Sequence, residues 1–229
     1  MKILIGCPTY NKQAYCLDRF LEALQHIDFP NYDILLVDNT EESNEYYEHI
    51  KNKGIAVIKD NTKGSARQKL ESSRNILRQK ALEGNYEYLL TLDQDIIVPK
   101  DILQKLLENK KDFVTGIYFT HMEKQGIIKT IPVIFIDTKI PRQVTHLSIE
   151  QAFKDQLIQI RSCGLGCTLV SKKLLEKLDF SIDKNFKGGE DTYFCLQVQK
   201  KGFEIYCDTR VKCKHLITEQ KEKWKDIEF

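Results

Sequence analysis

The sequence predicts an α/β fold, built on a mostly parallel sheet with helices on both faces. In its first half, apolar stretches of strand length alternate with amphipathic stretches of helix length, joined by short connections. Several of these strands are continuous apolar runs, which is typical of parallel strands buried on both faces. A chain of 229 residues buries about 70% of its unfolded surface, enough for a sizeable core without disulfides.

Each element of the first half has a local signal. Leu17, Phe20, Leu21, Leu24 and Ile27 repeat at helical spacing and give one apolar face. Pro-Asn and Gly-Asn pairs end the first and third helices, and a proline starts the fourth. The predicted strands are 2–6, 33–38, 54–60 and 87–93, and the predicted helices are 17–27, 41–52, 65–82 and one that begins at Pro99.

The second half is less regular. Apolar runs predict strands at 113–119 and 126–137, which can pair as a hairpin, while 138–158 shows little pattern and indicates a mobile loop or a short helix. The remaining predicted elements are a strand with a glycine bend at 160–171, helices at 172–178 and 188–202, and short strands at 203–208 and 210–216.

Composition excludes several classes of protein. Lys and Arg number 35 against 33 Asp and Glu, so the net charge of +2 gives no support for nucleic-acid binding. No apolar stretch approaches the ~20 residues that span a bilayer, and the N-terminal MKILIG reads as a strand rather than a secretory signal. Seven scattered cysteines in a chain with a good core indicate reduced thiols, so we expect a cytoplasmic location.

Polar residues directly follow three of the predicted strands, at 7–11, 38–40 and 93–95. In open parallel sheets, ligands bind outside the carboxyl ends of the strands, so these segments are the candidate binding loops. No G-x-G-x-x-G follows the first strand and no Walker loop occurs, which argues against NAD and P-loop chemistry.

Asp93-Gln94-Asp95 stands where the fourth strand ends. Two carboxylates one residue apart can reach one hard cation, and Mg²⁺ is usually held by one or two carboxylates together with substrate phosphates. The competing interpretation is a pair of solvated loop acids.

Gly188-Gly189-Glu190-Asp191 precedes a predicted helix. Acids at a helix start often only cap free N–H groups, but an acid held there can also accept a proton from a substrate hydroxyl. His215 follows a short strand and is either a surface or core histidine or a ligand. Cys207 and Cys213 lie near it, but a zinc site is disfavoured because no C-x-x-C pair occurs.

Six segments in order resemble the GT-A glycosyltransferases, and most closely their large family two. These segments are CPTYN at 7–11, LLVDN at 35–39, SSRN at 72–75, YLLTLDQDI at 88–96, GLGCTLVSKKLLEKL at 164–178 and GGEDTYFCLQVQKKGFEIYCD at 188–208. The resemblance implies a GT-A type, Rossmann-like sheet in a single domain over 1–217. Residues 1–110 would form the nucleotide-sugar-binding half and 111–217 the acceptor and catalytic half, followed by a charged tail at 218–229.

The resemblance also implies roles for individual residues. Asp191 would be the general base, with Glu190 beside it. The donor would be held by Pro8, Thr9, Tyr10, Asn11, Asp38, Arg74 and Asp93. Asp93, Asp95 and His215 would hold Mn²⁺ or Mg²⁺.

The implied reaction is metal-dependent transfer of a sugar from a UDP- or GDP-linked donor to an acceptor hydroxyl, with inversion. The acceptor would be a glycan, a lipid-linked molecule or a small molecule, and a peripheral membrane contact through the Trp224 tail stays open. Three alternatives remain: a retaining GT-A transferase, a nucleotidyltransferase, for which CPTYN lacks the glycine-rich phosphate loop, and a non-catalytic sugar-nucleotide-binding module.

Overall fold

A central sheet organises the protein in the computed structural model, which describes residues 1–41 and 43–217. Eight strands of the described chain form it, and four of the seven neighbouring pairs are parallel. In spatial order the strands are β11 (Leu157–Gln159), β14 (Tyr206–Lys212), β6 (Phe113–Ile117), β13 (Cys167–Ser171), β4 (Tyr88–Leu92), β1 (Ile3–Thr9), β2 (Tyr32–Asp38) and β3 (Ala56–Lys59).

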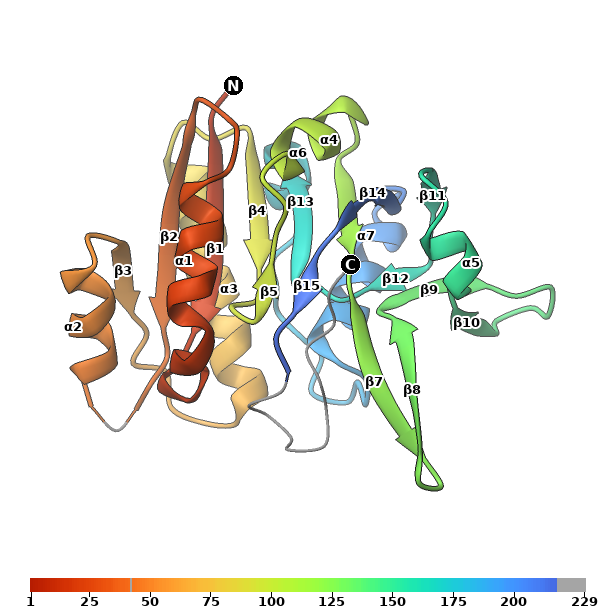
Figure 1. Ribbon diagram of the computed structural model, residues 1–229, viewed down its shortest axis with the longest axis horizontal. Helices are drawn as coiled ribbons and strands as arrows, with labels where there is room; N and C mark the ends of the chain where they lie inside the picture. The colour runs from red at the N-terminus through yellow and green to blue at the C-terminus, as the bar shows by residue number, and fades with distance from the viewer. Residues whose placement is uncertain (42, 218–229) are drawn as a thin grey trace.

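Helices cover both faces of this sheet (Figure 1). On one face lie α1 (Leu17–Gln25), which follows the 3₁₀ helix η1 (Asn11–Cys16), α2 (Glu45–Asn52) and α4 (Ile102–Glu108). On the other lie α3 (Ala66–Glu83), α6 (Lys172–Leu175) and α7 (Glu190–Lys200). Each layer buries its own apolar cluster against the sheet, as the amphipathic patterns predict. Within the described residues, no helix is both long and apolar enough to cross a membrane.

Smaller strands extend the second half of the chain. β10 (Val144–His146), β9 (Ile134–Asp137) and β12 (Ser162–Cys163) form one small sheet, with α5 (Ile149–Ala152) nearby. β5 (Ile96–Ile97) pairs with β15 (Lys214–His215). β7 (Phe119–Lys124) and β8 (Ile127–Pro132) form a two-stranded hairpin that projects from the body of the molecule (Figure 1).

Most predicted elements are confirmed, but three assignments in the second half are wrong. The strands predicted at 113–119 and 126–137 are each divided in two, into β6 and β7 and into β8 and β9, and the hairpin forms between β7 and β8 only. The stretch 138–158 is not simply a loop with a short helix, because β10 and β11 flank α5 within it. The two strands expected at 203–208 and 210–216 are instead one strand, β14, followed by the short β15. The polar residues Asp208 and Thr209 suggested a break, yet both are fully buried inside β14. The charged tail at 218–229 lies outside the described residues.

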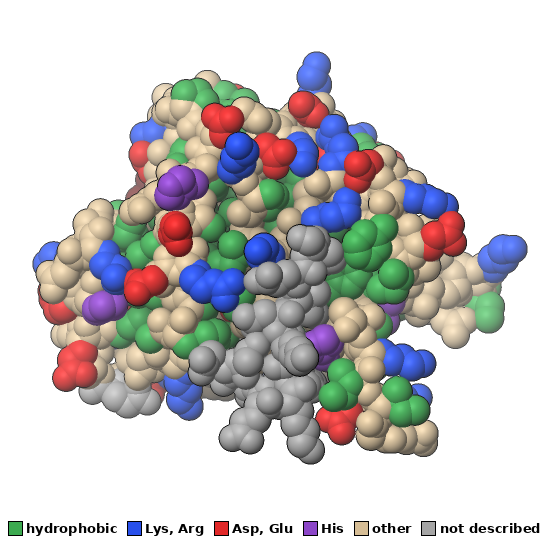
Figure 2. Space-filling model, in the orientation of Figure 1, with side chains coloured by type: hydrophobic (Ala, Val, Ile, Leu, Met, Phe, Trp, Pro, Cys, Tyr) green, Lys and Arg blue, Asp and Glu red, His purple; other side chains and the backbone are tan. Residues whose placement is uncertain are grey.

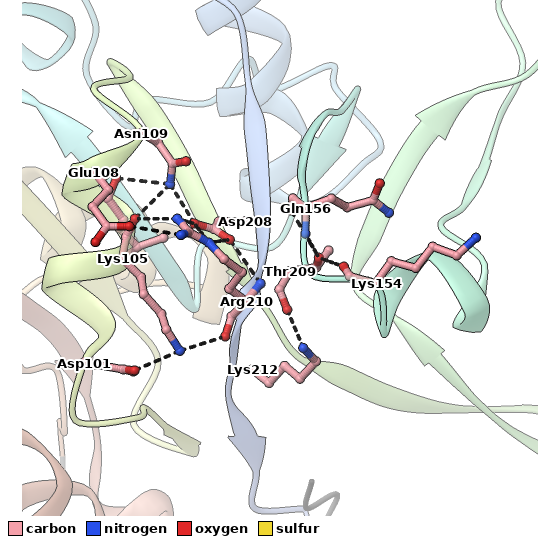
Figure 3. A network of polar contacts seen from close by, with 11 residues as sticks. Asp101, Lys105, Glu108, Asn109, Lys154, Gln156, Asp208, Thr209, Arg210 and Lys212 are labelled. Atoms are coloured by element: carbon pink, nitrogen blue, oxygen red, sulfur yellow. Dashed lines mark hydrogen bonds and ion pairs between the residues drawn. The ribbon is translucent and has the colours of Figure 1, made fainter.

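A polar network makes that burial tolerable (Figure 3). The guanidinium of Arg210 donates to both carboxylate oxygens of Asp208, with Nη2 2.7 Å from Oδ2, and Asn109 at the end of α4 donates to Oδ2 over 2.7 Å. Burial by itself would raise the pKa of Asp208, but the hydrogen bonds from Arg210 and Asn109 outweigh it and lower that pKa below its ordinary value. The network therefore fixes β14 against α4.

We predict that Arg210→Ala lowers the free energy of unfolding by about 2 kcal/mol at neutral pH, because the buried Asp208 loses its charged donor and keeps only Asn109 and a backbone N–H. A lowered pKa contributes stability above the unfolded value near ~4 and loses it as the pH falls, so the effect should shrink towards pH ~3. Urea unfolding across pH measures this. Lys212→Ala is the control, since its carboxylate partner Asp155 is exposed and its other acceptor is a backbone carbonyl, so no buried charge loses its partner. Equal losses in both variants would contradict the prediction.

Candidate functional site

A cleft of about 490 Å³ opens at the carboxyl ends of β1, β2 and β4. All three loops that the sequence nominated contribute to it. Its lining consists of Pro8, Thr9, Tyr10, Asn11, Lys12, Gln13, Asn39, Thr40, Glu41, Ala66, Lys69, Leu70, Asp93 and Asp95. The backbone N–H of Asn39 donates to the Thr9 carbonyl over 3.0 Å, and that of Asn11 donates to the Thr40 hydroxyl over 2.9 Å, so the first two loops are held together.

Gln94, between the two aspartates, ties the cleft to its surroundings. Its side chain is fully buried, and its Oε1 accepts hydrogen bonds from the hydroxyls of Thr9 and, over 2.9 Å, of Tyr46 in α2. Its Nε2 donates to the Gln13 carbonyl in η1 over 2.6 Å. One amide thus connects β1, α2 and η1 to the loop that carries Asp93 and Asp95. Sequence reasoning treated Gln94 only as a spacer.

Arg74 lies beneath the cleft rather than in it. Its side chain is 1% exposed; Nη1 donates to the Thr91 hydroxyl, and Nη2 donates to Oδ1 of Asp93 over 2.8 Å. The same Nη2 lies 4.0 Å from Oε1 of Glu190 at the start of α7. A buried cation therefore links the cleft to the acidic helix start, two motifs that are about 100 positions apart in the sequence.

Acids crowd around Arg74. Burial raises the pKa of Asp93. The Arg74 guanidinium lowers that pKa, whereas the negative charges of Asp95 and Asp191 raise it, and the net result is a raised pKa. Burial likewise raises the pKa of Glu190. The charge of Arg74 lowers that pKa, and the charges of Asp191 and Asp93 raise it further. These mutual effects show that Asp93, Glu190 and Asp191 share one electrostatic environment.

The bend at Gly164–Gly166 shapes the other side of Asp93. A β-carbon at Gly166 would lie only 2.7 Å from Oδ2 of Asp93 and 3.0 Å from the buried hydroxyl of Tyr118. Only glycine leaves room for the backbone to approach this carboxylate so closely. Both oxygens of Asp93 are thus constrained, one by Arg74 and the other by the bend.

His215 stands next to Asp95. The β15–β5 pairing places His215 opposite Ile96, and Nε2 lies 3.6 Å from Oδ2 of Asp95. Nδ1 lies 2.7 Å from the Phe119 carbonyl, which can only accept, so Nδ1 carries the proton. Burial alone would lower the pKa of His215, but Asp95, the Phe119 carbonyl and the charge of Asp93 together raise it.

This arrangement suits a divalent cation. A metal-binding histidine commonly donates its second ring N–H to a backbone carbonyl, which leaves the other nitrogen as a ligand. Among residues 1–41 and 43–217, no three His, Cys, Asp or Glu side chains come together as a metal-holding group. Of the three predicted ligands, Asp95 and His215 are adjacent, whereas Oδ1 of Asp93 is engaged by Arg74.

Asp191 lies in the first turn of α7, half-buried, and its Oδ1 accepts hydrogen bonds from the N–H and hydroxyl of Thr192. Asp38, by contrast, is fully buried and does not line the cleft. Its Oδ1 accepts from the Thr40 N–H, and its Oδ2 is 2.8 Å from the Lys59 ammonium. The structure therefore gives Asp38 contacts that order the second loop.

Several cleft residues were missed from the sequence. Lys12 and Lys69 bring positive charge to the lining, and Lys69 pairs with Glu41 over 3.0 Å. Lys12 directly follows the CPTYN segment, which was a usable signal. Lys69 lies in the first turn of α3, and no local sequence pattern indicated that this turn lines the cleft.

We predict that Gln94→Ala lowers the free energy of unfolding by about 2 kcal/mol, because the buried hydroxyls of Thr9 and Tyr46 keep only each other and the Gln13 carbonyl loses its donor. Chemical denaturation measures this. Gln79→Ala, on the exposed face of α3, is the matched control and should cost much less. Similar losses in the two variants would remove Gln94 from its structural role.

Solved structures with the same fold were found, all at low sequence identity. A197 from STIV is similar with a TM-score of 0.53 and 20% identity, over 96% of this chain and 87% of that one. TarS 1–349 of S. aureus in complex with UDP-GlcNAc is similar with a TM-score of 0.55 and 16% identity, over 93% of this chain and 58% of that one. The mannosyltransferase PcManGT from Pyrobaculum calidifontis, in complex with GDP-Man and Mn²⁺, is similar with a TM-score of 0.61 and 14% identity, over 93% of this chain and 56% of that one. The chain thus spans little more than half of the latter two proteins.

The sequence itself shows the family. No curated protein sequence matches this chain significantly. The profile of glycosyl transferase family 2, however, matches residues 5–179, about three quarters of the chain and every segment that lines the cleft. Together with the mostly parallel sheet and its likeness to GT-A enzymes, this match shows that the protein is a glycosyltransferase of the GT-A fold and belongs to glycosyl transferase family 2.

Proposed function

We propose that this glycosyltransferase moves a sugar from a nucleotide-diphosphate sugar to an acceptor hydroxyl, with inversion at the anomeric carbon and with help from a divalent cation. The observation that carries the proposal is the connection of the cleft to the start of α7 through Arg74, which lies 2.8 Å from Asp93 and 4.0 Å from Glu190. A binding loop and an acidic helix start are thereby held in one site.

The cleft has the chemistry to hold the donor. Tyr10 presents an exposed ring and Asn11 a polar side chain along one wall, while Lys12 and Lys69 supply positive charge for a diphosphate. UDP- or GDP-linked donors are the class we infer, and TarS and PcManGT, two similar structures, are in complexes with UDP-GlcNAc and GDP-Man.

Asp95 and His215 are the residues that would hold Mn²⁺ or Mg²⁺. Such cations usually take one or two protein ligands and complete their coordination with substrate phosphates, so this pair is sufficient when a diphosphate is present. When bound, the cation would supply positive charge against the negative charge that grows on the departing diphosphate. Asp93 would assist from its fixed position beside Arg74.

Asp191 is the residue we assign as general base. It lies in the first turn of α7, next to Glu190, which Arg74 connects to the cleft. From there its carboxylate could accept the proton of the acceptor hydroxyl as the oxygen attacks the anomeric carbon from the face opposite the diphosphate. Glu190 would position the acceptor or the donor sugar beside it.

We predict that UDP or GDP binds more tightly when Mn²⁺ or Mg²⁺ is added, and that Asp95→Ala abolishes this gain because the cation loses its carboxylate. Isothermal titration calorimetry with and without EDTA measures the difference. Asp137→Ala, an exposed acid on β9, is the control and should keep the gain. Equal affinity of the wild-type protein with metal and with EDTA would rule out metal-assisted binding.

We also predict that Asp191→Asn lowers kcat by about 100-fold or more, the scale of general-base loss, while nucleotide affinity changes little. Glu190→Gln should lose less, partly through the acceptor KM. Steady-state kinetics with an identified acceptor, read beside nucleotide titrations, measures both. Near-normal turnover of Asp191→Asn would refute the base assignment, and a product that keeps the donor's anomeric configuration would favour the retaining mechanism.

A further inference from the structure

The β7–β8 hairpin is a feature that sugar transfer does not explain. Its base is buried at Phe119 and Pro132, and its strands then run out to a tight turn at Gln125 and Gly126, both with positive φ. Figure 1 shows that the hairpin projects beyond the body in the direction in which β1 and β4 end, which is the side of the cleft.

The pairing register sorts the hairpin side chains into two faces. Met122 pairs with Lys129 and Lys124 pairs with Ile127, so these four residues share one face. That face also includes Thr120 and Ile131 and contains no acid. We call it the basic apolar face, made of Thr120, Met122, Lys124, Ile127, Lys129 and Ile131.

The opposite face belongs to the protein body. It includes Phe119, whose ring lies 6.0 Å from that of Phe153 at the end of α5. It also carries the acid of the hairpin, Glu123, paired with Ile128. Because successive residues of a strand alternate between faces, the basic apolar face lies on the side away from α5.

The apolar residues near the tip are unusually exposed. Ile127 is 60% exposed, Ile128 42% and Met122 41%. Of the ten large hydrophobic residues that are exposed in the described chain, eight lie between positions 122 and 157. In Figure 2 hydrophobic side chains lie on this projection at the lower right of the molecule, with Lys or Arg and Asp or Glu side chains beside them. Such exposure on a projecting element marks an interaction surface.

We propose that the tip of the β7–β8 hairpin inserts shallowly into the surface of an anionic lipid bilayer. Ile127 and Met122 would enter the boundary between head groups and acyl chains, and Lys124 and Lys129 would pair with lipid phosphates. This goes beyond the proposed function and does not depend on it, because the contact needs neither donor nor acceptor.

Charge decides between a bilayer and a second copy of the chain. A symmetric dimer through the basic apolar face would bring two copies of Lys124 and of Lys129 together with no acid on that face to compensate. An anionic bilayer supplies both the negative charge for the lysines and the apolar interior for the isoleucines. The bilayer is therefore the partner that fits every side chain of this face.

Vesicle co-sedimentation of the full chain tests the proposal directly. We expect binding to vesicles of equal parts phosphatidylglycerol and phosphatidylcholine, weak binding to phosphatidylcholine alone, and loss of binding as salt rises to about 0.5 M. Lys124→Gln and Lys129→Gln should each weaken binding about five-fold. Lys177→Gln and Lys201→Gln, in another lysine-rich surface, are the charge-matched controls and should bind normally.

A second set of variants tests the contribution of the hydrophobic side chains to vesicle binding. Ile127→Asp should weaken binding about ten-fold or more, whereas Ile140→Asp, equally exposed on the turn between β9 and β10, should have little effect. Circular dichroism melts confirm that each variant folds. In a Trp224→Phe background, the fluorescence of Met122→Trp should shift to the blue on vesicle binding and be quenched by brominated lipid.

Three results would overturn the proposal. The first is that neither vesicle type binds the wild-type chain. The second is that Ile140→Asp or the control lysine variants lose as much binding as the hairpin variants. The third is that sedimentation equilibrium shows a dimer that Ile127→Asp dissociates.

Discussion

The buried guanidinium of Arg74 is the interaction on which the site depends. Its two terminal nitrogens reach β4 through Thr91, the strand end through Asp93, and the start of α7 near Glu190, while its Nε has no partner within the described residues. A cation enclosed at 1% exposure is costly unless acids surround it, and those acids repel one another unless a cation lies between them. Each group therefore makes the burial of the others tolerable, and we expect this mutual compensation to hold the two halves of the site in one geometry.

Much of this could be predicted from the sequence. The apolar runs of the first half predicted β1 to β4 but not the short β5, and the rule that ligands lie beyond the carboxyl ends of parallel strands predicted the three loops that line the cleft. Order along the chain was sufficient because β1, β2 and β4 are neighbours in the sheet and their ends necessarily meet. The six ordered segments pointed to the family that the profile match then showed.

The rest depended on contacts between distant residues, which a single sequence does not record. Asp208 was predicted to end a strand because its second donor, Asn109, lies on a helix about 100 positions earlier, and Arg210 two positions on did not by itself indicate a buried pair. Asp38 looked like a ligand-facing acid because its partner Lys59 lies on the next strand. Arg74 was predicted to contact the donor, because its position on α3 did not reveal that its side chain is buried against Thr91 and Asp93. In each case at least one partner that sets the side chain's role lies on another strand or helix.

The place of β13 in the sheet has a consequence for synthesis of the chain. β13 is inserted antiparallel between β4 and β6, so residues 88–92 find their outer partner only at 167–171. Until about 170 residues have left the ribosome, β4 presents an open edge of buried-type residues, a known liability for association with other chains. The nascent chain must therefore either cover the open edge of β4 or remain uncollapsed until β13 is available. The sheet can be completed only by this contact between residues far apart in the sequence.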